Sequence, residues 1–234
     1  MPSGLFIISA PSGSGKTTLV RELFKLVPGL RFSISYTTRT PRGSEENGRE
    51  YFFVSRAEFE AMIRREEFLE HAEVFGNYYG TAWSFLHEAQ QRNEDLVLDI
   101  DVQGAGLVKA RFPEARGIFI APPDRETLAW RLSHRGLDRP EVVERRLRDA
   151  SREIAAYARY DYVLINDRLR ESVEALAAIV VSERARLHGP PPEFSPAELE
   201  RFRELTASCL QSRVHDRLAP ILHSFGIEAA APAR

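Results

Sequence analysis

A loop of small residues that ends in a lysine and a threonine is the first place where this sequence could do chemistry. The loop reads Ser12-Gly13-Ser14-Gly15-Lys16-Thr17, after an apolar run at Leu5–Ser9 and before a helical pattern at Thr17–Val27. Glycines let backbone N–H groups curl around phosphate oxygens, and a helix N-terminus adds partial positive charge. In this pattern the lysine reaches the β- and γ-phosphates and the threonine hydroxyl binds Mg²⁺. The loop therefore predicts a nucleoside triphosphate site with Mg²⁺ as cofactor.

One position departs from the full pattern G-x-x-x-x-G-K-[ST], which has glycine where this chain has Ala10. Alanine carries a Cβ and loses the freedom of glycine to adopt positive φ, so a glycine-rich turn without a nucleotide is the alternative interpretation. The order strand, loop, helix favours the phosphate loop. The expected ATP-binding residues here are Ala10, Pro11, Ser12, Gly13, Ser14, Gly15, Lys16, Thr17 and Thr18.

A phosphate loop does not name an acceptor, but two later segments do. They are Phe32–Val54 (FSISYTTRTPRGSEENGREYFFV) and Glu67–Thr81 (EFLEHAEVFGNYYGT). Together with Asp99–Gly104 (DIDVQG) and Tyr160–Asp167 (YDYVLIND), they make the sequence strongly resemble guanylate kinase over about residues 4–188. The resemblance implies phosphoryl transfer from ATP to GMP, and to dGMP, giving ADP and GDP. Bacterial members of that family also accept alanine at the position of Ala10.

The resemblance also implies which side chains hold GMP, and the chemistry of those side chains suits the task. Two guanidinium groups fork onto a phosphate dianion, and two phenols add hydrogen bonds without charge. A carboxylate can accept both the N1–H and N2–H₂ groups of guanine, whereas adenine has no donor at N1. The alternatives are surface charge for the arginines and a solvated helix-end acid for the glutamate. The phosphate set is Ser35, Arg39, Arg42, Tyr51 and Tyr79, and the base set is Glu70, Thr81 and Asp101.

An arginine-rich segment, 125–152, holds eight arginines, which in isolation favours a solvated helix face. Arg131 and Arg135 are four residues apart on one helix face, and Arg146 follows beyond Pro140. The resemblance implies a lid in which these three arginines close over the triphosphate and stabilise the charge of the transferring group. The expected catalytic residues are Lys16, Arg42, Arg131, Arg135 and Arg146.

Two further residues follow apolar strands. In the family pattern Asp99 binds Mg²⁺ through a water, beside the hydroxyl of Thr17, and Asn166 contacts the adenine of ATP. No protein base is expected, because the second ionisation of a phosphate monoester has a pKa near ~6 and the GMP oxygen is already largely anionic at neutral pH.

The elements that must position these residues alternate between strands and helices. Continuous apolar runs at Leu5–Ser9, Leu96–Ile100, Gly117–Ile120 and Tyr162–Ile165 are typical of parallel strands covered on both faces. Between them lie helical patterns, which makes the fold class α/β. With the resemblance, we expect a three-layer P-loop NTPase fold with a parallel sheet, an inserted GMP-binding lobe and a helical lid. The predicted helices are Gly104–Arg111, Arg125–Ser133, Pro140–Tyr157 and Leu169–Leu187.

Residues 33–92 interrupt that alternation. Short β-rich pieces at Ser33–Tyr36 and Tyr51–Val54 precede a helix at Arg56–Glu66, with Ser55 as N-cap and Glu58 at the capping-box position. The predicted boundaries are a guanylate kinase-like domain over 1–188 and a helical extension of unknown role over 189–234. Within the domain we expect a core of 1–32, 96–124 and 158–188, a GMP-binding lobe of 33–95 and a lid of 125–157.

The extension opens with Ser195 as N-cap, Pro196 at the first helical position and Glu198 completing a capping box. An apolar stripe then runs at helical spacing to Leu218, and Pro220 is expected to end the helix. Such a helix either binds a partner or packs onto its own domain, and the second is favoured.

Composition limits the remaining function classes. Hydrophobic residues make up 43% and charged residues 28%, and a net charge of −2 gives no global basic field for nucleic acid. One cysteine, Cys209, excludes an internal disulfide and fits a reducing compartment, and the histidines show no zinc-ligand spacing with it. Met1–Gly4 lacks a positive leader, and no apolar run approaches the ~20 residues that span a bilayer. We expect a soluble cytoplasmic protein with no membrane partner, its oligomeric state undecided.

Two other functions compete with an active guanylate kinase. A scaffold domain would keep the GMP lobe and lose the ATP machinery, but Lys16, Thr17 and the lid arginines are present. A P-loop kinase acting on a phosphorylated sugar would not need a guanine-reading set such as Glu70, Thr81 and Asp101. The small-molecule substrates expected are therefore ATP and GMP.

Overall fold

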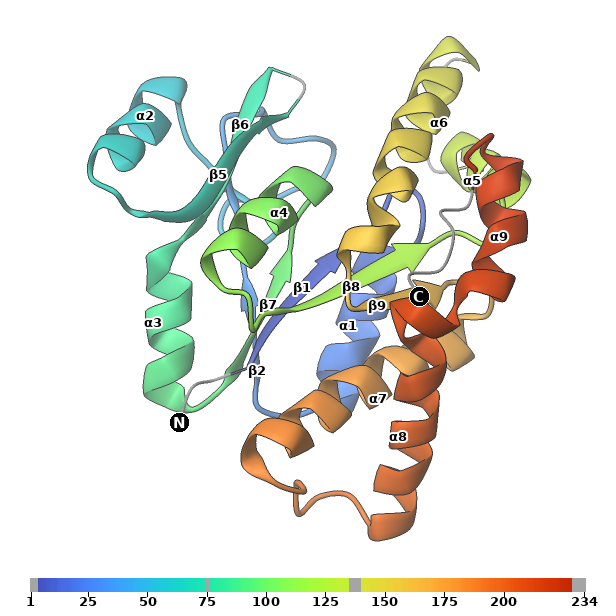
Figure 1. Ribbon diagram of the computed structural model, residues 1–234. Helices are drawn as coiled ribbons and strands as arrows, with labels where there is room; N and C mark the ends of the chain where they lie inside the picture. The colour runs from blue at the N-terminus through green and yellow to red at the C-terminus, as the bar shows by residue number, and fades with distance from the viewer. Residues whose placement is uncertain (1–3, 75, 135–139, 229–234) are drawn as a thin grey trace. The chain divides into compact units, whose positions relative to one another are not determined.

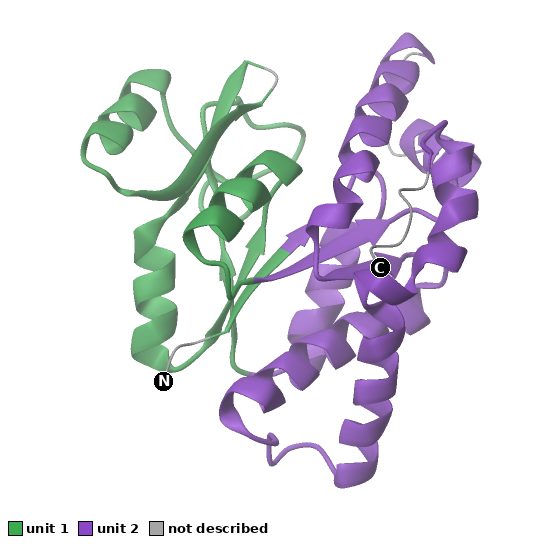
Figure 2. Cartoon of the chain, in the orientation of Figure 1, with its two compact units in different colours: residues 1–7, 29–115 green, residues 8–28, 116–234 purple. Residues whose placement is uncertain are grey.

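The computed structural model describes residues 4–74, 76–134 and 140–228. Its contacts divide the chain into two compact units, the first made of residues 1–7 and 29–115 and the second of residues 8–28 and 116–234 (Figure 2). The predicted core, lobe and lid follow from the alternation of strands and helices and from the family resemblance. The division into these two units does not test them, so those boundaries stay a prediction.

The larger sheet has the strand order β2-β7-β1-β8-β9 (Figure 1). Its strands are β1 (Leu5–Ser9), β2 (Leu30–Ser33), β7 (Asp95–Asp99), β8 (Arg116–Ala121) and β9 (Tyr162–Ile165). In the first unit β2 pairs with β7 in parallel, and in the second β8 pairs with β9 in parallel. Every residue of β1 is buried, as a continuous apolar run predicts for a strand covered on both faces. The predicted α/β class is confirmed.

The helices that follow these strands also match the sequence pattern. They are α1 (Lys16–Leu26), α4 (Val102–Arg111), α5 (Arg125–His134), α6 (Pro140–Ile154) and α7 (Leu169–His188). The helix predicted over Pro140–Tyr157 ends earlier, because the chain tightens into a 3₁₀ turn at Ala155–Arg159. In the second unit α7 packs against both α1 and β9.

The first unit contains a second sheet, of order β4-β3-β6-β5. Its strands are β3 (Tyr36–Thr37), β4 (Phe52–Phe53), β5 (Phe68–Val74) and β6 (Asn77–Ala82). The prediction of a single β piece at Ser33–Tyr36 is wrong, because Ser33 ends β2 of the larger sheet and Tyr36 begins β3 of this one.

Two helices accompany this smaller sheet. Helix α2 (Arg56–Arg64) begins as predicted, with the Ser55 hydroxyl accepting from the Glu58 N–H, and it packs Phe59 and Met62 against Phe68. Helix α3 (Trp83–Arg92), which the sequence analysis did not predict, packs on β2 and β7. Within the described residues no helix combines the length and the apolar character that a bilayer span requires.

The C-terminal extension forms two helices, α8 (Pro196–Cys209) and α9 (His215–Ser224). The capping box at Ser195 and Glu198 is confirmed. The prediction that one helix runs to Pro220 is wrong, since the helix ends at Cys209 and Pro220 lies inside α9. The physical reason is tertiary, because Leu210 leaves the helix to pair with Tyr162 of β9. The interpretation that the extension packs onto its own domain is confirmed, because α8 lies along α7.

Candidate active site

The phosphate loop depends on glycine at two positions. Gly13 and Gly15 have φ values of 93° and 90°, in the left-handed region that side chains avoid. A Cβ on Gly13 would lie 2.9 Å from the Leu132 side chain, and one on Gly15 would collide with the Asn166 amide. Ala10 is not among the described residues with positive φ, so this position needs no glycine. The departure from the full motif therefore leaves the loop geometry intact.

Helix α1 begins directly after this loop, with Gly15 as its N-cap and Lys16 and Thr17 as its first two residues. Among the described residues no side chain caps this end, and its first turn carries no acid. The N-terminal end of the helix dipole therefore faces the loop without a competing carboxylate, which favours a bound phosphate.

Three other predicted donor-site residues contact this loop or each other. The Asn166 side-chain amide donates to the Ser14 carbonyl at 2.6 Å, and the Arg131 guanidinium donates to the Asn166 carbonyl at 3.2 Å. The Arg146 guanidinium donates to the Ser12 hydroxyl at 2.6 Å. The structure thus brings these side chains together around the loop. Arg135 lies outside the described residues.

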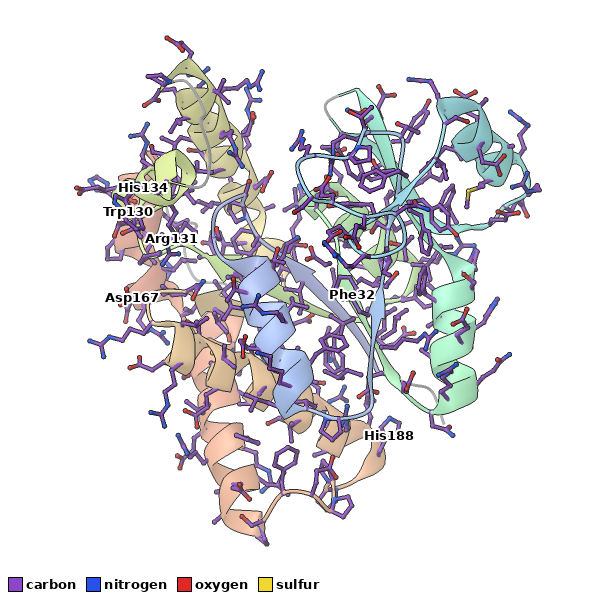
Figure 3. All side chains as sticks on the ribbon, turned by 180° about the vertical axis from the view of Figure 1, so that it is seen from behind. Phe32, Trp130, Arg131, His134, Asp167 and His188 are labelled. Carbon is purple, nitrogen blue, oxygen red and sulfur yellow. The ribbon has the colours of Figure 1, made fainter. Side chains whose placement is uncertain are left out.

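A cavity of about 300 Å³ opens beside the loop in the second unit. Trp130, Arg131 and His134 on α5 line this cavity together with Asp167, which follows β9; Figure 3 labels these side chains. The Trp130 indole is 60% exposed and stacks on the His134 ring at a centroid distance of 4.2 Å. Sequence reasoning missed both rings, although two aromatic residues four apart around Arg131 were the available signal. The cavity is lined by Gly13, Gly15, Thr18, Trp130, Arg131, His134, Asn166, Asp167 and Leu169.

In the first unit, Glu70 and Thr81 form a buried cross-strand pair. Glu70 on β5 is in register with Thr81 on β6, and the Thr81 hydroxyl donates to the Glu70 carboxylate at 2.7 Å. Burial, reinforced by the charge of nearby Asp101, raises the pKa of Glu70 to about 7, against the opposing effect of the Thr81 hydrogen bond. Glu70 is therefore a carboxyl group poised between its neutral and ionised forms near neutral pH.

Asp101 and Gly104 lie beside the Glu70 carboxyl group. Asp101 is the N-cap of α4, and its carboxylate accepts from the Gly104 N–H at 2.8 Å. A Cβ on Gly104 would lie 2.9 Å from Glu70 Oε2, so the start of α4 approaches the Glu70 carboxylate closely. The three predicted base-reading residues are thus neighbours, and Asp101 has a capping role as well.

The predicted phosphate-binding residues of the first unit also gather. Ser35 and Arg39 are buried, the Arg39 guanidinium lies 5.2 Å from the Tyr51 ring centroid, and the Tyr51 and Tyr79 rings are 6.0 Å apart. Arg42 is exposed, on the loop that follows β3. These residues combine one buried guanidinium, one exposed guanidinium and two phenols, a set suited to a phosphate dianion.

Glu45 is a residue of this site that sequence reasoning missed. Its carboxylate accepts from Arg39 Nη1 and Nη2 at 2.9 and 3.0 Å and from the Arg42 backbone N–H at 2.7 Å. The Arg39 hydrogen bonds hold the pKa of Glu45 below its usual value, and the Glu45 carboxylate raises the pKa of Arg39. Glu45 therefore occupies the same guanidinium fork that a phosphate would use.

The residues predicted for Mg²⁺ have suitable chemistry. Thr17 is an exposed residue in the first turn of α1, and Asp99 is the last residue of β7. Mg²⁺ takes hard oxygen ligands and in nucleotide enzymes obtains most of them from phosphates and water. In the described part of the chain no group of three or more His, Cys, Asp or Glu side chains is placed to hold a metal ion. One hydroxyl from Thr17 and one carboxylate from Asp99 fit a Mg²⁺ ion that enters with a nucleotide and takes its other ligands from phosphate and water.

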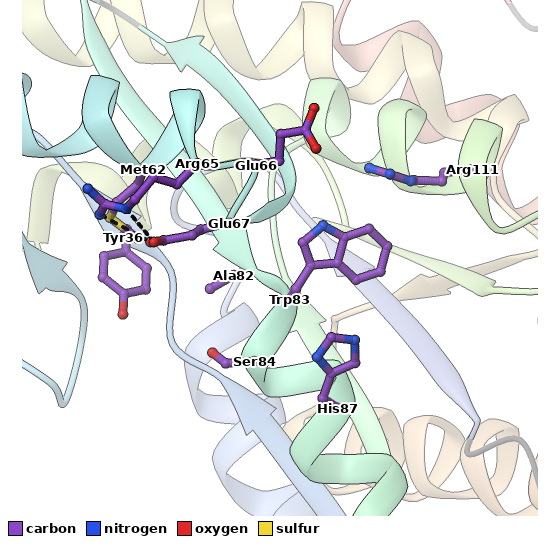
Figure 4. A pocket seen from close by; sticks show the side chains of 10 residues that line it. All are labelled: Tyr36, Met62, Arg65, Glu66, Glu67, Ala82, Trp83, Ser84, His87 and Arg111. Atoms are coloured by element: carbon purple, nitrogen blue, oxygen red, sulfur yellow. Dashed lines mark hydrogen bonds and ion pairs between the residues drawn. The ribbon is translucent and has the colours of Figure 1, made fainter.

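The first unit has a larger cavity, of about 610 Å³, that includes none of the predicted site residues (Figure 4). Arg65 pairs with Glu67 there at 2.5 Å, and the Arg111 guanidinium lies 4.5 Å from the Trp83 ring. Arg65 and Arg111 thus have partners among the residues that line the cavity. None of the lining residues belongs to the predicted ATP or GMP sites.

Comparison with known proteins agrees with this geometry. The family model described as guanylate kinase matches residues 3–183. The guanylate kinase of Koribacter versatilis (strain Ellin345) is 54% identical over 228 residues, covering 96% of this chain and 97% of that protein. The guanylate kinase of Dechloromonas aromatica (strain RCB) is 51% identical over 180 residues, covering 77% of this chain and 89% of that protein.

A crystal structure of guanylate kinase from Anaplasma phagocytophilum superposes with a TM-score of 0.63 at 32% identity, covering 80% of this chain and 87% of that chain. Fold, phosphate loop and sequence similarity agree with the resemblance found in the sequence and with its P-loop NTPase fold. The chain belongs to the guanylate kinase family.

Proposed function

We propose that this protein transfers the γ-phosphoryl group of ATP to GMP, and to dGMP, giving ADP and GDP. The observation that carries the proposal is the buried Glu70–Thr81 pair, in a chain that also has an intact phosphate loop. The relatives named guanylate kinase, which match most of this chain, support it.

The acceptor base is selected by Glu70. When ionised, its carboxylate accepts from both N1–H and N2–H₂ of guanine, while the Thr81 hydroxyl fixes one of its oxygens. Adenine has no N1 donor and would leave the buried carboxylate without the two donors that guanine supplies, with only the Thr81 hydroxyl on one oxygen. Sites built on such hydrogen bonds can discriminate between substrates by a factor on the order of 10⁴. Asp101 adds a second acceptor beside Glu70.

The GMP phosphate binds to Ser35, Arg39, Arg42, Tyr51 and Tyr79 in this proposal. Because the Arg39 guanidinium already donates two hydrogen bonds to Glu45, the GMP phosphate must either displace the Glu45 carboxylate or bind the guanidinium together with it. The attacking atom is a GMP phosphate oxygen, which is largely ionised near neutral pH, so positioning and cationic groups supply the catalysis.

The donor triphosphate binds to the loop from Ala10 to Thr18, with Lys16 on the β- and γ-phosphates. Arg131, Arg135 and Arg146 close over the transferring group as a lid, and Asn166 lies at the adenine. The exposed Trp130 indole beside the loop offers a surface on which the donor base stacks.

Mg²⁺ would supply positive charge that neutralises the negative charge developing on the transferring phosphoryl group. Thr17 would hold it directly and Asp99 through a water. The location we propose is the cytoplasm, where a single cysteine stays reduced.

The test is ADP release from ATP and Mg²⁺ with GMP, dGMP, AMP, UMP or a sugar phosphate offered separately. Turnover confined to guanine nucleotides supports the proposal. Turnover with the sugar phosphate would favour the related P-loop kinase, and GMP binding without turnover would favour the scaffold domain.

A further inference from the structure

The C-terminal extension lies largely beyond the part of the chain that the family model matches, which ends at residue 183. Residues 195–225 of this extension, named here the C-terminal clamp, contact three elements of the second unit that also support the phosphate loop.

The first contact is with α7 and β9. Helix α8 lies along α7, where the Thr206 hydroxyl donates to the Ser182 hydroxyl at 3.0 Å. At the end of α8 the Gln211 N–H donates to the Asp161 carbonyl at 3.0 Å, and Leu210 forms an antiparallel bridge with Tyr162. The clamp thus pairs with β9, an edge strand of its sheet, just before the chain reaches Asn166.

The second contact is with the start of α5. The Ser224 hydroxyl of α9 accepts from the backbone N–H of Arg125, the first residue of α5, at 3.1 Å. The same hydroxyl donates to the Ile221 carbonyl at 2.7 Å, which fixes its orientation and leaves a lone pair for the Arg125 N–H. The first N–H groups of a helix have no acceptor within the helix. For the Arg125 N–H of α5 the acceptor is the hydroxyl of Ser224, 99 positions away in the chain.

The buried face of α9 holds Ser224 in place. Leu218, Leu222 and Phe225 are buried, and the Phe225 N–H donates to the Leu222 carbonyl at 3.0 Å. The hydroxyl is therefore presented from a packed helix and not from a loose chain end.

Helix α5 in turn contacts the phosphate loop. Leu128 and Leu132 lie so close to Gly13 that a Cβ there would come within 3.0 and 2.9 Å of them. On the same helix Arg131 donates to the Asn166 carbonyl, and the Asn166 amide donates to the Ser14 carbonyl. A continuous series of contacts therefore runs from Ser224 through α5 to the backbone of the loop.

We propose that the C-terminal clamp positions α5 against the phosphate loop and that Ser224 is a positioning residue for the donor nucleotide. The Arg125–Ser224 hydrogen bond fixes the first turn of α5 and, with it, the contacts of Leu128, Arg131 and Leu132. The inference rests on the proposed function in taking ATP as the nucleotide held by this loop.

The test is Ser224→Ala in the full-length chain, with Ser224→Thr to restore the hydroxyl. The matched control is Ser208→Ala, because Ser208 lies in the same clamp and, among the described residues, its hydroxyl contacts its own helix: it donates to the Leu205 carbonyl at 2.7 Å and lies 3.9 Å from Cys209 Sγ. Removal of the whole extension would expose the buried face of α7 and so would not isolate the effect of the Ser224 hydroxyl.

Loss of one such hydrogen bond should raise the Kd of a non-hydrolysable ATP analogue, and the KM for ATP, about 2- to 10-fold. The KM for GMP should change less than about 2-fold, since its predicted ligands lie in the first unit. Hydrogen exchange of the α5 amides should be faster in Ser224→Ala, and normal in Ser224→Thr and Ser208→Ala.

Two results would overturn the inference: unchanged ATP parameters in Ser224→Ala, or an equal loss for ATP and GMP, which indicates general destabilisation. The binding measurement needs no turnover. If the parent protein failed to phosphorylate GMP while Ser224→Ala still weakened the ATP analogue, the proposed function would fail and the positioning role would stand.

Discussion

The pKa of Glu70 makes GMP binding depend on pH in a way that can be calculated. Guanine donates two hydrogen bonds to the ionised carboxylate, so only that form binds it well. Because the pKa of Glu70 in the free protein is about 7, roughly 90% of the group is ionised at pH 8 and roughly 10% at pH 6. Binding of GMP below pH 7 must therefore release a proton from Glu70, and the affinity should rise with pH.

The expected magnitude is a Kd for GMP about ten times larger at pH 6 than at pH 8 from this group alone. The GMP phosphate also titrates, with a pKa near ~6, so it adds its own pH dependence. Glu70→Gln separates the two, because it keeps the side-chain volume and the phosphate contacts and removes the titration. Calorimetric titration of GMP at pH 6, 7 and 8 into both proteins gives the difference.

Between pH 6 and pH 8 the Kd for GMP should change about ten times more in the parent than in Glu70→Gln. At pH 8 the Gln variant should bind GMP more weakly than the parent and discriminate less against AMP. Parallel pH profiles for the two proteins would refute the reasoning, since Glu70 would then have the same charge throughout. A variant that still rejected AMP as fully as the parent would refute the carboxylate as the base-reading group.

Two further predictions concern the donor nucleotide. Lys16→Ala should lower kcat by orders of magnitude while the Kd for GMP stays nearly unchanged, because Lys16 binds the donor phosphates. The matched control is Lys25→Ala, at the far end of α1, where Lys25 pairs with Glu22 at 2.9 Å. Equal losses in kcat and in GMP affinity would contradict the assignment of Lys16 to the donor site. Trp130→Ala should raise the KM for ATP about 5- to 150-fold, from a stacking contribution of ~1–3 kcal/mol, while Trp130→Phe keeps most of the affinity. Because the chain has two tryptophans, Trp83→Phe leaves Trp130 as the reporter, and ATP should quench its fluorescence; an unquenched indole would rule out stacking.

Much of the fold could be predicted from the sequence, because its signals are local. Continuous apolar runs located β1 and β9 at their observed bounds, and the Ser55 and Ser195 caps located the starts of α2 and α8. Each of these features depends on residues close in the chain, so spacing alone identifies it.

The features that were missed depend on contacts between distant residues. Leu210 has the spacing of a helical stripe, yet it leaves the helix because pairing with Tyr162 of β9 replaces the lost helical contacts. Likewise, the sequence analysis assigned no role to Glu45 or Trp130, because the pairing of Glu45 with Arg39 and the 60% exposure of Trp130 appear only in the folded chain. Sequence reasoning therefore named most of the residues of the candidate site, while the partners of those residues required the structure.

The raised pKa of Glu70 also has a consequence for stability. The pKa is about 7 in the folded protein and 4.5 for an unperturbed glutamate, so the folded state binds more protons than the unfolded state between these values. The free energy of unfolding should then fall as pH rises from 4.5 to 7, by about 3 kcal/mol, and should change no further from this group above pH 7.

Glu70→Gln removes this titration, so its stability relative to the parent should rise by about 3 kcal/mol between pH 4.5 and pH 8, measured by urea unfolding at both pH values. A parent that instead gained stability over the variant with rising pH would show that the folded state favours the ionised carboxyl. A glutamine would pack equally well in this site and would carry no such cost. Since a carboxylate can accept both guanine donors, base recognition accounts for a glutamate at this destabilising position, in accordance with the trade-off between stability and activity at binding sites.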